Sequence, residues 1–302
     1  MKRLTANLLL ALCSASWGLA YPLIEICNRE ISTFTLLFYR FLFAVLILVA
    51  VLFPRLKHIN RDLIKYSMIS GVFVALLLIF VILSVKYTTS ATAGFILGSA
   101  VALVIIIDAI IKRKLPKIPV IIGVCLILFG VGMLSMGKDG LTFNSGAIVA
   151  VIGAIIYAVY IHIVNYLTPK IDAINFGTYQ LFITVFVGLA CMLIFEPVVN
   201  PLTWSVNAWL SLLGLSAICT SFCFLLQSTA QKYSTAQDTG LIFTIEPVSA
   251  ALYSAWILGE ELTINTFIGG GLIVFGIIIS ILYTHHKAKN QVESKNTLKS
   301  SK

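Results

Sequence analysis

Charged residues are scarce in this chain. They make up 11% of its 302 residues, against 59% that are hydrophobic, and the mean hydropathy is +1.01. A soluble domain has about a quarter of its residues charged, because its surface faces water. This composition excludes an ordinary soluble domain and predicts that lipid is the solvent for most of the chain.

Clusters of metal-binding or nucleophilic residues are also missing. Five of the six cysteines fall within apolar runs, and Cys27 falls beside a connection. Cys219 and Cys223 are one helical turn apart, which we interpret as small packing residues rather than a metal or disulfide motif. The four histidines, His58, His162, His285 and His286, are scattered. We expect no metal, no cofactor and no enzymatic activity.

Long apolar runs dominate the chain instead. A run of about 20 residues can cross about 30 Å of hydrocarbon as a helix. Ten such runs are present: 5–25, 32–53, 64–85, 91–111, 118–136, 144–166, 173–195, 206–230, 236–258 and 264–284. Short alternating segments, which a transmembrane β-barrel requires, do not occur. We predict an all-α membrane protein with ten transmembrane helices, and we interpret the first run as a retained span rather than a signal peptide.

The basic residues are distributed unevenly about these spans. If the N-terminus is cytoplasmic, the inner connections and both tails hold 17 of the 21 basic residues. Arg29, Lys86 and Lys138 fall in outer connections, and Arg40 falls within a span. The positive-inside rule therefore predicts that both termini are cytoplasmic. The net charge of +9 reflects topology, so we expect no nucleic-acid partner. Short loops and the lack of an organelle address favour a bacterial cytoplasmic (inner) membrane.

The chain contains an internal repeat. A shift of 146 residues aligns 86–133 with the second half and pairs Lys86, Tyr87 and Gly94 with Lys232, Tyr233 and Gly240. We assign a first five-helix repeat to 1–137, a second to 138–285 and a disordered cytoplasmic tail to 286–302. Because five is odd, the two repeats enter the membrane in opposite orientations. Inverted repeats are a recurrent plan of secondary transporters, and duplication for stability alone is the alternative.

Four motifs carry a family resemblance. "FYRF" in the second span, "EPVSAAL" in the ninth, and "LGEELT" followed by "GGGLIVFG" resemble the EamA branch of the drug/metabolite transporter superfamily, over residues 5 to 284. The resemblance implies a ten-helix bundle that exports small metabolites, such as amino acids, by alternating access. The first half departs from the pattern, because Ala100 and Val101 stand where the second half has Glu246 and Pro247. Substrate identity does not follow from the resemblance.

Glu246 is the principal candidate for a functional residue. It falls near the middle of the ninth span, where an ionised carboxylate is costly and usually functional. Helical spacing places Thr239, Ser249 and Tyr253 on the same face, whereas the matching face of the first half is apolar. We expect Glu246 to bind a substrate amine or to carry a proton. Pro247 removes a backbone N–H and so frees the carbonyl of Phe243 for another partner.

The eighth span carries a second polar stripe. Its members are Ser216, Thr220, Cys223 and Gln227, and their counterparts are Ser70, Val74, Leu77 and Val81. This asymmetry predicts a polar cavity displaced towards the second half, with the first half supplying an apolar wall. Hydrogen bonding between helices is the alternative for the Ser and Thr residues.

Arg40 and three aromatic residues complete the candidate set. Arg40 is expected at the depth of Trp17, where it either holds a substrate carboxylate, stacks on the indole ring or bonds backbone carbonyls. Tyr21 follows Trp17 by one turn, and Tyr157 belongs to a similar patch on the sixth span. These rings are too deep to be interfacial anchors, so they either pack the core or form walls for a ligand.

The function predicted from these features is secondary transport. We expect export or exchange of a small organic metabolite, with an amino acid or related compound as the leading choice, and with protons as a possible coupling ion. A multidrug or cation exporter of the same fold is the first alternative, and a membrane-embedded enzyme acting on lipid is the second. Apart from the substrate and the lipid bilayer, no partner is predicted, and the oligomeric state is not predicted.

Overall fold

A computed structural model describes residues 1–54, 56, 60–87, 96–135, 145–259, 261–262, 264–265 and 267–280. The described chain is helical and contains no strand. Seven of its helices are long and apolar enough to cross a membrane: Arg3–Asn28, Thr33–Leu52, Arg61–Tyr87, Ser145–Leu167, Ala173–Phe195, Val206–Gln231 and Ala236–Leu258. The chain is therefore an all-α, multi-pass membrane protein, as predicted.

Three further helices are shorter within the described residues. They are α6 (Ala100–Lys112), α7 (Ile118–Ser135) and the helix Phe267–Ser280. A helix thus lies within each of the ten predicted spans, although membrane crossing by these three remains a prediction. The predicted tail 286–302 lies outside the described residues.

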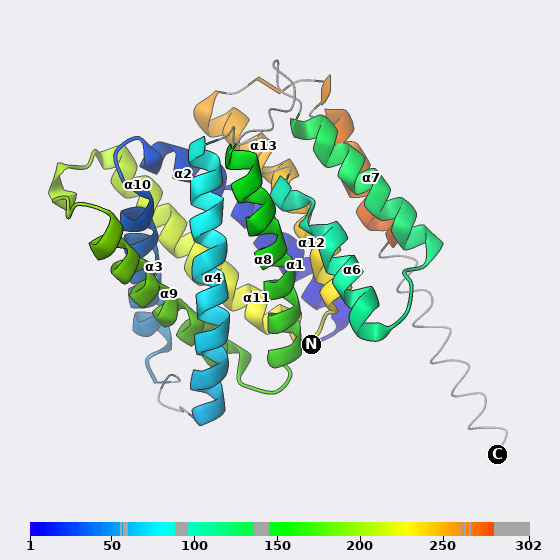
Figure 1. Cartoon of the computed structure of the whole chain (residues 1–302), viewed down its shortest axis with the longest axis horizontal. Coiled ribbons are helices and arrows are strands. Elements are labelled where there is room, and N and C mark those ends of the chain that lie inside the picture. The colour runs from blue at the N-terminus through cyan, green and yellow to red at the C-terminus, as the bar shows by residue number, and fades with distance from the viewer. Residues whose placement is uncertain are drawn as a thin grey trace.

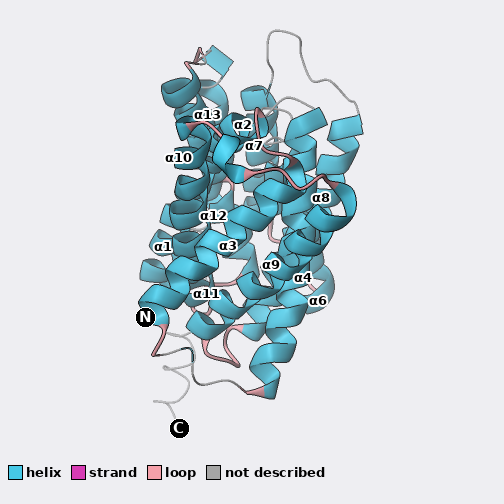
Figure 2. Ribbon diagram, turned by 90° about the vertical axis from the view of Figure 1, so that its left-hand side faces the viewer, coloured by secondary structure: helices cyan, strands magenta, loops and turns pink. Residues whose placement is uncertain are grey.

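The helices run side by side in one bundle (Figures 1 and 2). Long helices α4 (Arg61–Tyr87) and α8 (Ser145–Leu167) pack against each other, and α9 (Ala173–Phe195) packs against both α4 and α3 (Thr33–Leu52). This core joins helices of the two halves of the sequence. The helices α7 and Phe267–Ser280 lie at one side of the bundle (Figure 1).

Glycines allow α7 to approach the helix Phe267–Ser280 closely. A Cβ atom on Gly123 would lie 2.7 Å from the carbonyl oxygen of Gly276, and one on Gly130 would lie 2.6 Å from that of Gly269. Small residues at such spacing let membrane helices pack backbone to backbone. The sevenfold spacing of Gly123 and Gly130, and of Gly269 and Gly276, is therefore a packing feature.

Two of the long membrane helices are broken near their middles. The first divides into α1 (Arg3–Gly18) and α2 (Ala20–Asn28), and the ninth divides into α12 (Ala236–Phe243) and α13 (Ile245–Leu258). A proline sits two residues into each second part, Pro22 in α2 and Pro247 in α13. A proline lacks the N–H that would continue the helix and clashes with the preceding turn, which accounts for both breaks.

The eighth span is irregular in a different way. It consists of α10 (Val206–Gly214), the π-helical segment η3 (Leu215–Phe222) and α11 (Cys223–Gln231). A π turn holds one more residue than an α turn and occurs frequently at functional sites. Its counterpart within α4 is regular α-helix.

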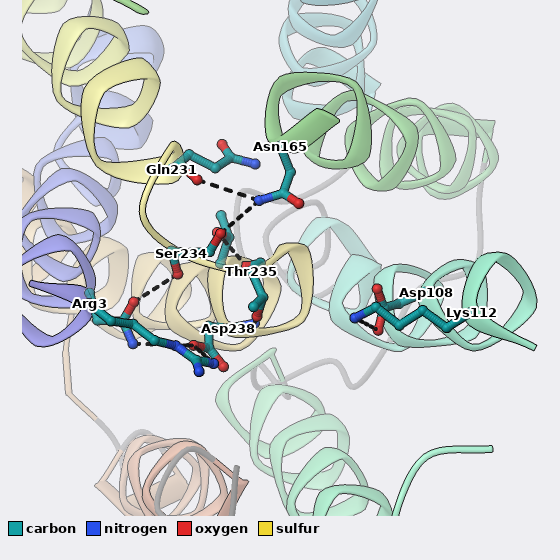
Figure 3. A network of polar contacts seen from close by, with 10 residues as sticks. Arg3, Asp108, Lys112, Asn165, Gln231, Ser234, Thr235 and Asp238 are labelled. Carbon is teal, nitrogen blue, oxygen red and sulfur yellow. Dashed lines mark hydrogen bonds and ion pairs between the residues drawn. The ribbon is translucent and has the colours of Figure 1, made fainter. Parts of the chain in front are cut away.

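A network of polar contacts involves residues near the N-terminus (Figure 3). Arg3 of α1 forms an ion pair with Asp238 of α12, whose carboxylate also accepts a hydrogen bond of 3.4 Å from Asn7. Ser234 donates to Asn7 at 2.7 Å, and Asn165 of α8 donates to the Ser234 carbonyl at 2.8 Å. The network therefore ties α1, α8 and α12 together.

Asp238 and Asp108 each stabilise their own helix. Thr235 caps α12 by accepting from the backbone N–H of Asp238, and Asp238 lies in the first turn, where a carboxylate suits the helix dipole. Asp108 pairs with Lys112 of the same helix at 2.8 Å. The ion pair of Asp238 with Arg3 was not predicted.

Candidate functional site

A cavity lies between the broken first span, the second and third spans and helices of the second half. Its volume, counted as the space that the centres of water molecules can occupy, is about 60 Å³. This is room for about four water molecules. Five predicted site residues line it: Trp17, Tyr21, Arg40, Tyr157 and Glu246. They come from five different helices, so only the tertiary structure brings them together.

The cavity holds one acid and one base that do not pair with each other. Glu246 accepts a hydrogen bond of 3.1 Å from the Tyr21 hydroxyl. Arg40 is 2% exposed, and its Nε donates to Thr220 Oγ1 at 2.8 Å. Its Nη1 has no hydrogen-bond partner, and no carboxylate of the described residues lies within ion-pair distance of it. A buried cation without a counter-ion is costly, so the cavity offers an anion a favourable position beside Arg40.

The two helix breaks place Tyr21 and Glu246 opposite each other. Each is the second residue of the helix that follows a break, and each directly precedes the proline. The N-terminus of α13 directs its dipole at the carboxylate of Glu246. The Phe243 carbonyl, which Pro247 leaves without its helical donor, accepts from Ser14 of α1 at 3.1 Å. The predicted freeing of this carbonyl therefore serves the contact between the two broken spans.

Aromatic rings surround the cavity. Trp17 contacts Tyr157, Phe224 and Phe243 edge-on, with ring centroids 6.5, 5.7 and 5.1 Å apart, and Tyr157 stacks on Phe243 at 6.1 Å. The indole N–H donates to the Cys219 carbonyl at 2.8 Å, which turns the ring edge towards the eighth span. Arg40 does not stack on Trp17, because its guanidinium is held by Thr220 instead.

The rest of the lining is apolar and comes mainly from the first half of the chain. Leu77, Leu78 and Val81 of α4 contribute, together with Leu97. Two of them, Leu77 and Val81, are counterparts of the polar stripe on the eighth span. This is the apolar wall that the asymmetry of the repeat predicts. Ile24 and Phe224 also line the cavity, and no signal in the sequence distinguishes them from other apolar residues.

A series of hydrogen-bonded, buried amide side chains begins at Tyr160. The Tyr160 hydroxyl donates to either Gln180, at 3.3 Å, or Gln227, at 3.2 Å. Gln227 donates to Gln231 at 3.2 Å, and Ser70 donates to Gln180 at 2.7 Å. Tyr160 lines the cavity, and although it belongs to the aromatic patch on the sixth span, it is not among the predicted site residues. Gln227, a predicted site residue, does not line the cavity itself but can accept a hydrogen bond from Tyr160, which does.

A second, smaller cavity lies on the other side of Glu246. It measures about 20 Å³ by the same criterion and is bordered by Gly98, Phe243, Thr244 and Pro247. This is room for about one water molecule. Glu246 therefore borders two cavities.

Five predicted residues lie outside both cavities: Thr220 and Gln227 of the eighth span, and Thr239, Ser249 and Tyr253 of the ninth. Thr239 donates to the Thr235 carbonyl at 2.9 Å, and Ser249 donates to the Glu246 carbonyl at 2.9 Å. Tyr253 is half-buried farther along α13. The expected single stripe from Thr239 to Tyr253 is interrupted, because the helix breaks at Thr244.

The fold and the cavity define a class: an all-helical, multi-pass membrane protein with a cavity between broken helices that is lined by charged and aromatic residues. The EamA-like transporter family matches the chain twice, over residues 4–136 and 144–282. The chain belongs to this family.

Similar proteins carry the same general name. An "uncharacterized transporter" of Archaeoglobus fulgidus is 26% identical over 288 residues, covering 92% of this chain and 98% of its own. Another from the same organism is 29% identical and covers 92% and 86%. "Uncharacterized transporter YetK" of Bacillus subtilis is 26% identical and covers 93% and 88%. A solved crystal structure shares the fold with a TM-score of 0.78 at 18% identity, over 93% of this chain and 98% of that one. The protein is thus a transporter of the EamA family.

Proposed function

We propose that this protein transports a small zwitterionic metabolite, an amino acid with an apolar side chain, across a bacterial cytoplasmic membrane. The substrate carboxylate binds Arg40, and its ammonium group binds Glu246. The observation that carries the proposal is the presence of these two opposite charges in one cavity without an ion pair between them. An amino acid supplies the counter-charge to each.

The walls favour an apolar side chain. Leucine and valine side chains of α4 and the rings of Trp17 and Phe224 face the cavity, and they offer no hydrogen bond to a polar group. An apolar side chain gains from leaving water, whereas a polar one would lose its hydrogen bonds. Leucine is therefore a suitable probe.

Transport proceeds by alternating access of two inverted five-helix repeats. Two successive family matches, a helix in each of the ten predicted spans and the broken helices at the cavity support this arrangement. The positive-inside distribution supports cytoplasmic termini. The Arg3–Asp238 ion pair joins α1 to α12 at the N-terminal end of the bundle, which supports a state in which the cavity is closed to the cytoplasm. The direction is export, and Glu246 supplies the proton site if transport is coupled to protons.

Counterflow of labelled L-leucine in proteoliposomes tests the proposal. Two analogues isolate the charges: 3-methylbutylamine lacks the carboxylate, and 4-methylpentanoate lacks the amine. We expect L-leucine to compete, and each analogue to compete at least about tenfold more weakly, because each leaves one charged partner unpaired. Glu246→Gln and Arg40→Gln should each weaken leucine competition by a similar factor.

Matched controls replace the same residue types away from the cavity. Glu196→Gln changes a carboxylate at the end of α9, and Arg29→Gln changes an exposed arginine that pairs with Glu25. Both should leave the leucine affinity unchanged. Absence of counterflow for every apolar amino acid would overturn the proposed substrate.

A cation exporter is the second candidate, and one observation favours it. Glu246 faces aromatic rings, which also suit a cation without a carboxylate. In that case 3-methylbutylamine would compete as well as leucine, and Arg40→Gln would not weaken its binding.

A further inference from the structure

The π-helical segment η3 presents a side-chain oxygen to Arg40. Thr220 Oγ1 accepts from Arg40 Nε at 2.8 Å and donates to the Leu215 carbonyl, five residues earlier, at 2.8 Å. Thr220 is fully buried. Because its own proton is engaged with Leu215, its lone pairs are directed at the guanidinium.

A second contact fixes the same turn against the second span. The Ser221 hydroxyl donates either to the Ser216 carbonyl, also five residues earlier, at 2.8 Å, or to the Ala44 carbonyl of α3, at 3.0 Å. In an α-helix, Ser and Thr bond carbonyls three or four residues back. Hydrogen bonds to carbonyls five residues earlier match the geometry of the π turn. The irregular backbone and the contacts with α3 therefore form one unit.

The matching segment of α4 in the first half has no such unit. The repeat places Val74 and Ala75 of α4 where the second half has Thr220 and Ser221, and α4 is regular there. Neither residue has a side-chain oxygen. The π turn and its hydroxyls are therefore specific to the half of the repeat that faces Arg40.

We propose that Thr220 is a positioning residue that holds Arg40 Nε and leaves the unpartnered Nη1 to bind a substrate carboxylate. The inference rests on the proposed function. Thr220 does not line the cavity, so it acts through Arg40 and not on the substrate. An arginine held at Nε loses less freedom when it binds a carboxylate, because its planar fork is already oriented.

Substitution of Thr220 in the full-length protein tests this role. Thr220→Val has the same shape but no oxygen, and we expect the KM for labelled L-leucine in proteoliposomes to rise about ten- to a hundredfold. The maximal rate should change little. Thr220→Ser keeps the oxygen and should restore the wild-type KM. Competition by 3-methylbutylamine, which has no carboxylate, should be the same in all three proteins.

Thr239→Val is the matched control. Thr239 is also a fully buried threonine, bonded to the carbonyl four residues earlier, and it lies outside the cavities. A loss in Thr220→Val no larger than in Thr239→Val would overturn the positioning role. So would failure of Thr220→Ser to restore the KM, or an equal loss of 3-methylbutylamine competition.

These variants distinguish failure of the positioning role from failure of the proposed function. If Arg40→Gln raises the leucine KM while Thr220→Val does not, carboxylate binding stands and the positioning role falls. If Arg40→Gln changes nothing, the carboxylate site itself is refuted.

Discussion

At the residue scale, Gly18 makes the crossing of the two broken spans possible. A Cβ atom at this position would lie 2.1 Å from Ser249 Oγ and 2.6 Å from the backbone nitrogen of Ala250. Glycine therefore allows α1 to touch the backbone of α13 directly. This contact places Trp17 and Tyr21 on one side of the cavity and Glu246 on the other.

Gly18→Ala should destabilise the protein by about 1–3 kcal/mol, because the added methyl group meets backbone that cannot rotate away. Gly271→Ala is the matched change, since nothing lies within 4 Å of a Cβ there. It should be neutral or stabilise slightly, because alanine is the better helix former. Thermal unfolding of the detergent-solubilised proteins measures both. Equal melting temperatures for the two variants would refute the close contact.

At the element scale, one helix caps another. The N-cap residue Ser32 makes no side-chain cap to its own helix α3. Glu196, at the end of α9, accepts instead from the backbone N–H groups of Phe34 and Thr35 at 2.9 and 2.8 Å, and from the Ser32 hydroxyl at 2.6 Å. Partial burial alone would raise the pKa of Glu196, but these hydrogen bonds outweigh it and hold its pKa below the ordinary value of 4.5.

This lowered pKa predicts how stability depends on pH. Because the folded pKa lies below the unfolded one, the stabilisation is complete above pH 4.5 and is lost as the pH falls through the folded value. Glu196→Gln should cost about 1 kcal/mol near pH 7. The difference in melting temperature from the wild type should shrink as the pH falls from about 6 to 3. A difference that stays constant over this range would contradict the prediction.

At the scale of the whole molecule, the ion pair between Arg3 and Asp238 joins α1 to α12 at the N-terminal end of the bundle. Under the alternating access proposed above, we expect these helices to separate when the cavity opens to this end. Cys13 of α1 lies between the cavity and this network, fully buried, with its thiol bonded to the Cys223 carbonyl at 3.3 Å. Its exposure therefore reports the opening.

Asp238→Asn should increase the rate at which N-ethylmaleimide labels Cys13, followed by mass spectrometry of the peptide that contains it. We expect a rise of about tenfold, the effect of weakening the closed state by about 1.4 kcal/mol. Asp108→Asn is the control, because Asp108 pairs with Lys112 within a single helix and holds no two elements together. An equal labelling rate in both variants would show that the Arg3–Asp238 pair does not hold this end closed.

Much of the site was predictable because the polar residues of a membrane span are few. Glu246, Arg40, Trp17, Tyr21 and Tyr157 stand out against an apolar background, and all five line the cavity. Thr239, Ser249 and Tyr253 were included on the assumption of a continuous helix. The helix is broken at Thr244, so that assumption is wrong. Helical spacing does not predict which residues share a face on the two sides of a break.

The sequence by itself determined that the protein is an all-helical, multi-pass membrane protein of this family. Lipid requires long apolar helices, and such runs can be read directly from composition and length. The tertiary structure decided the rest: the capping of α3 by Glu196, the pairing of Arg3 with Asp238, and the turn of Thr220 towards Arg40. Each of these contacts joins residues more than 150 positions apart. They depend on how helices cross and where they break, which local sequence patterns do not record.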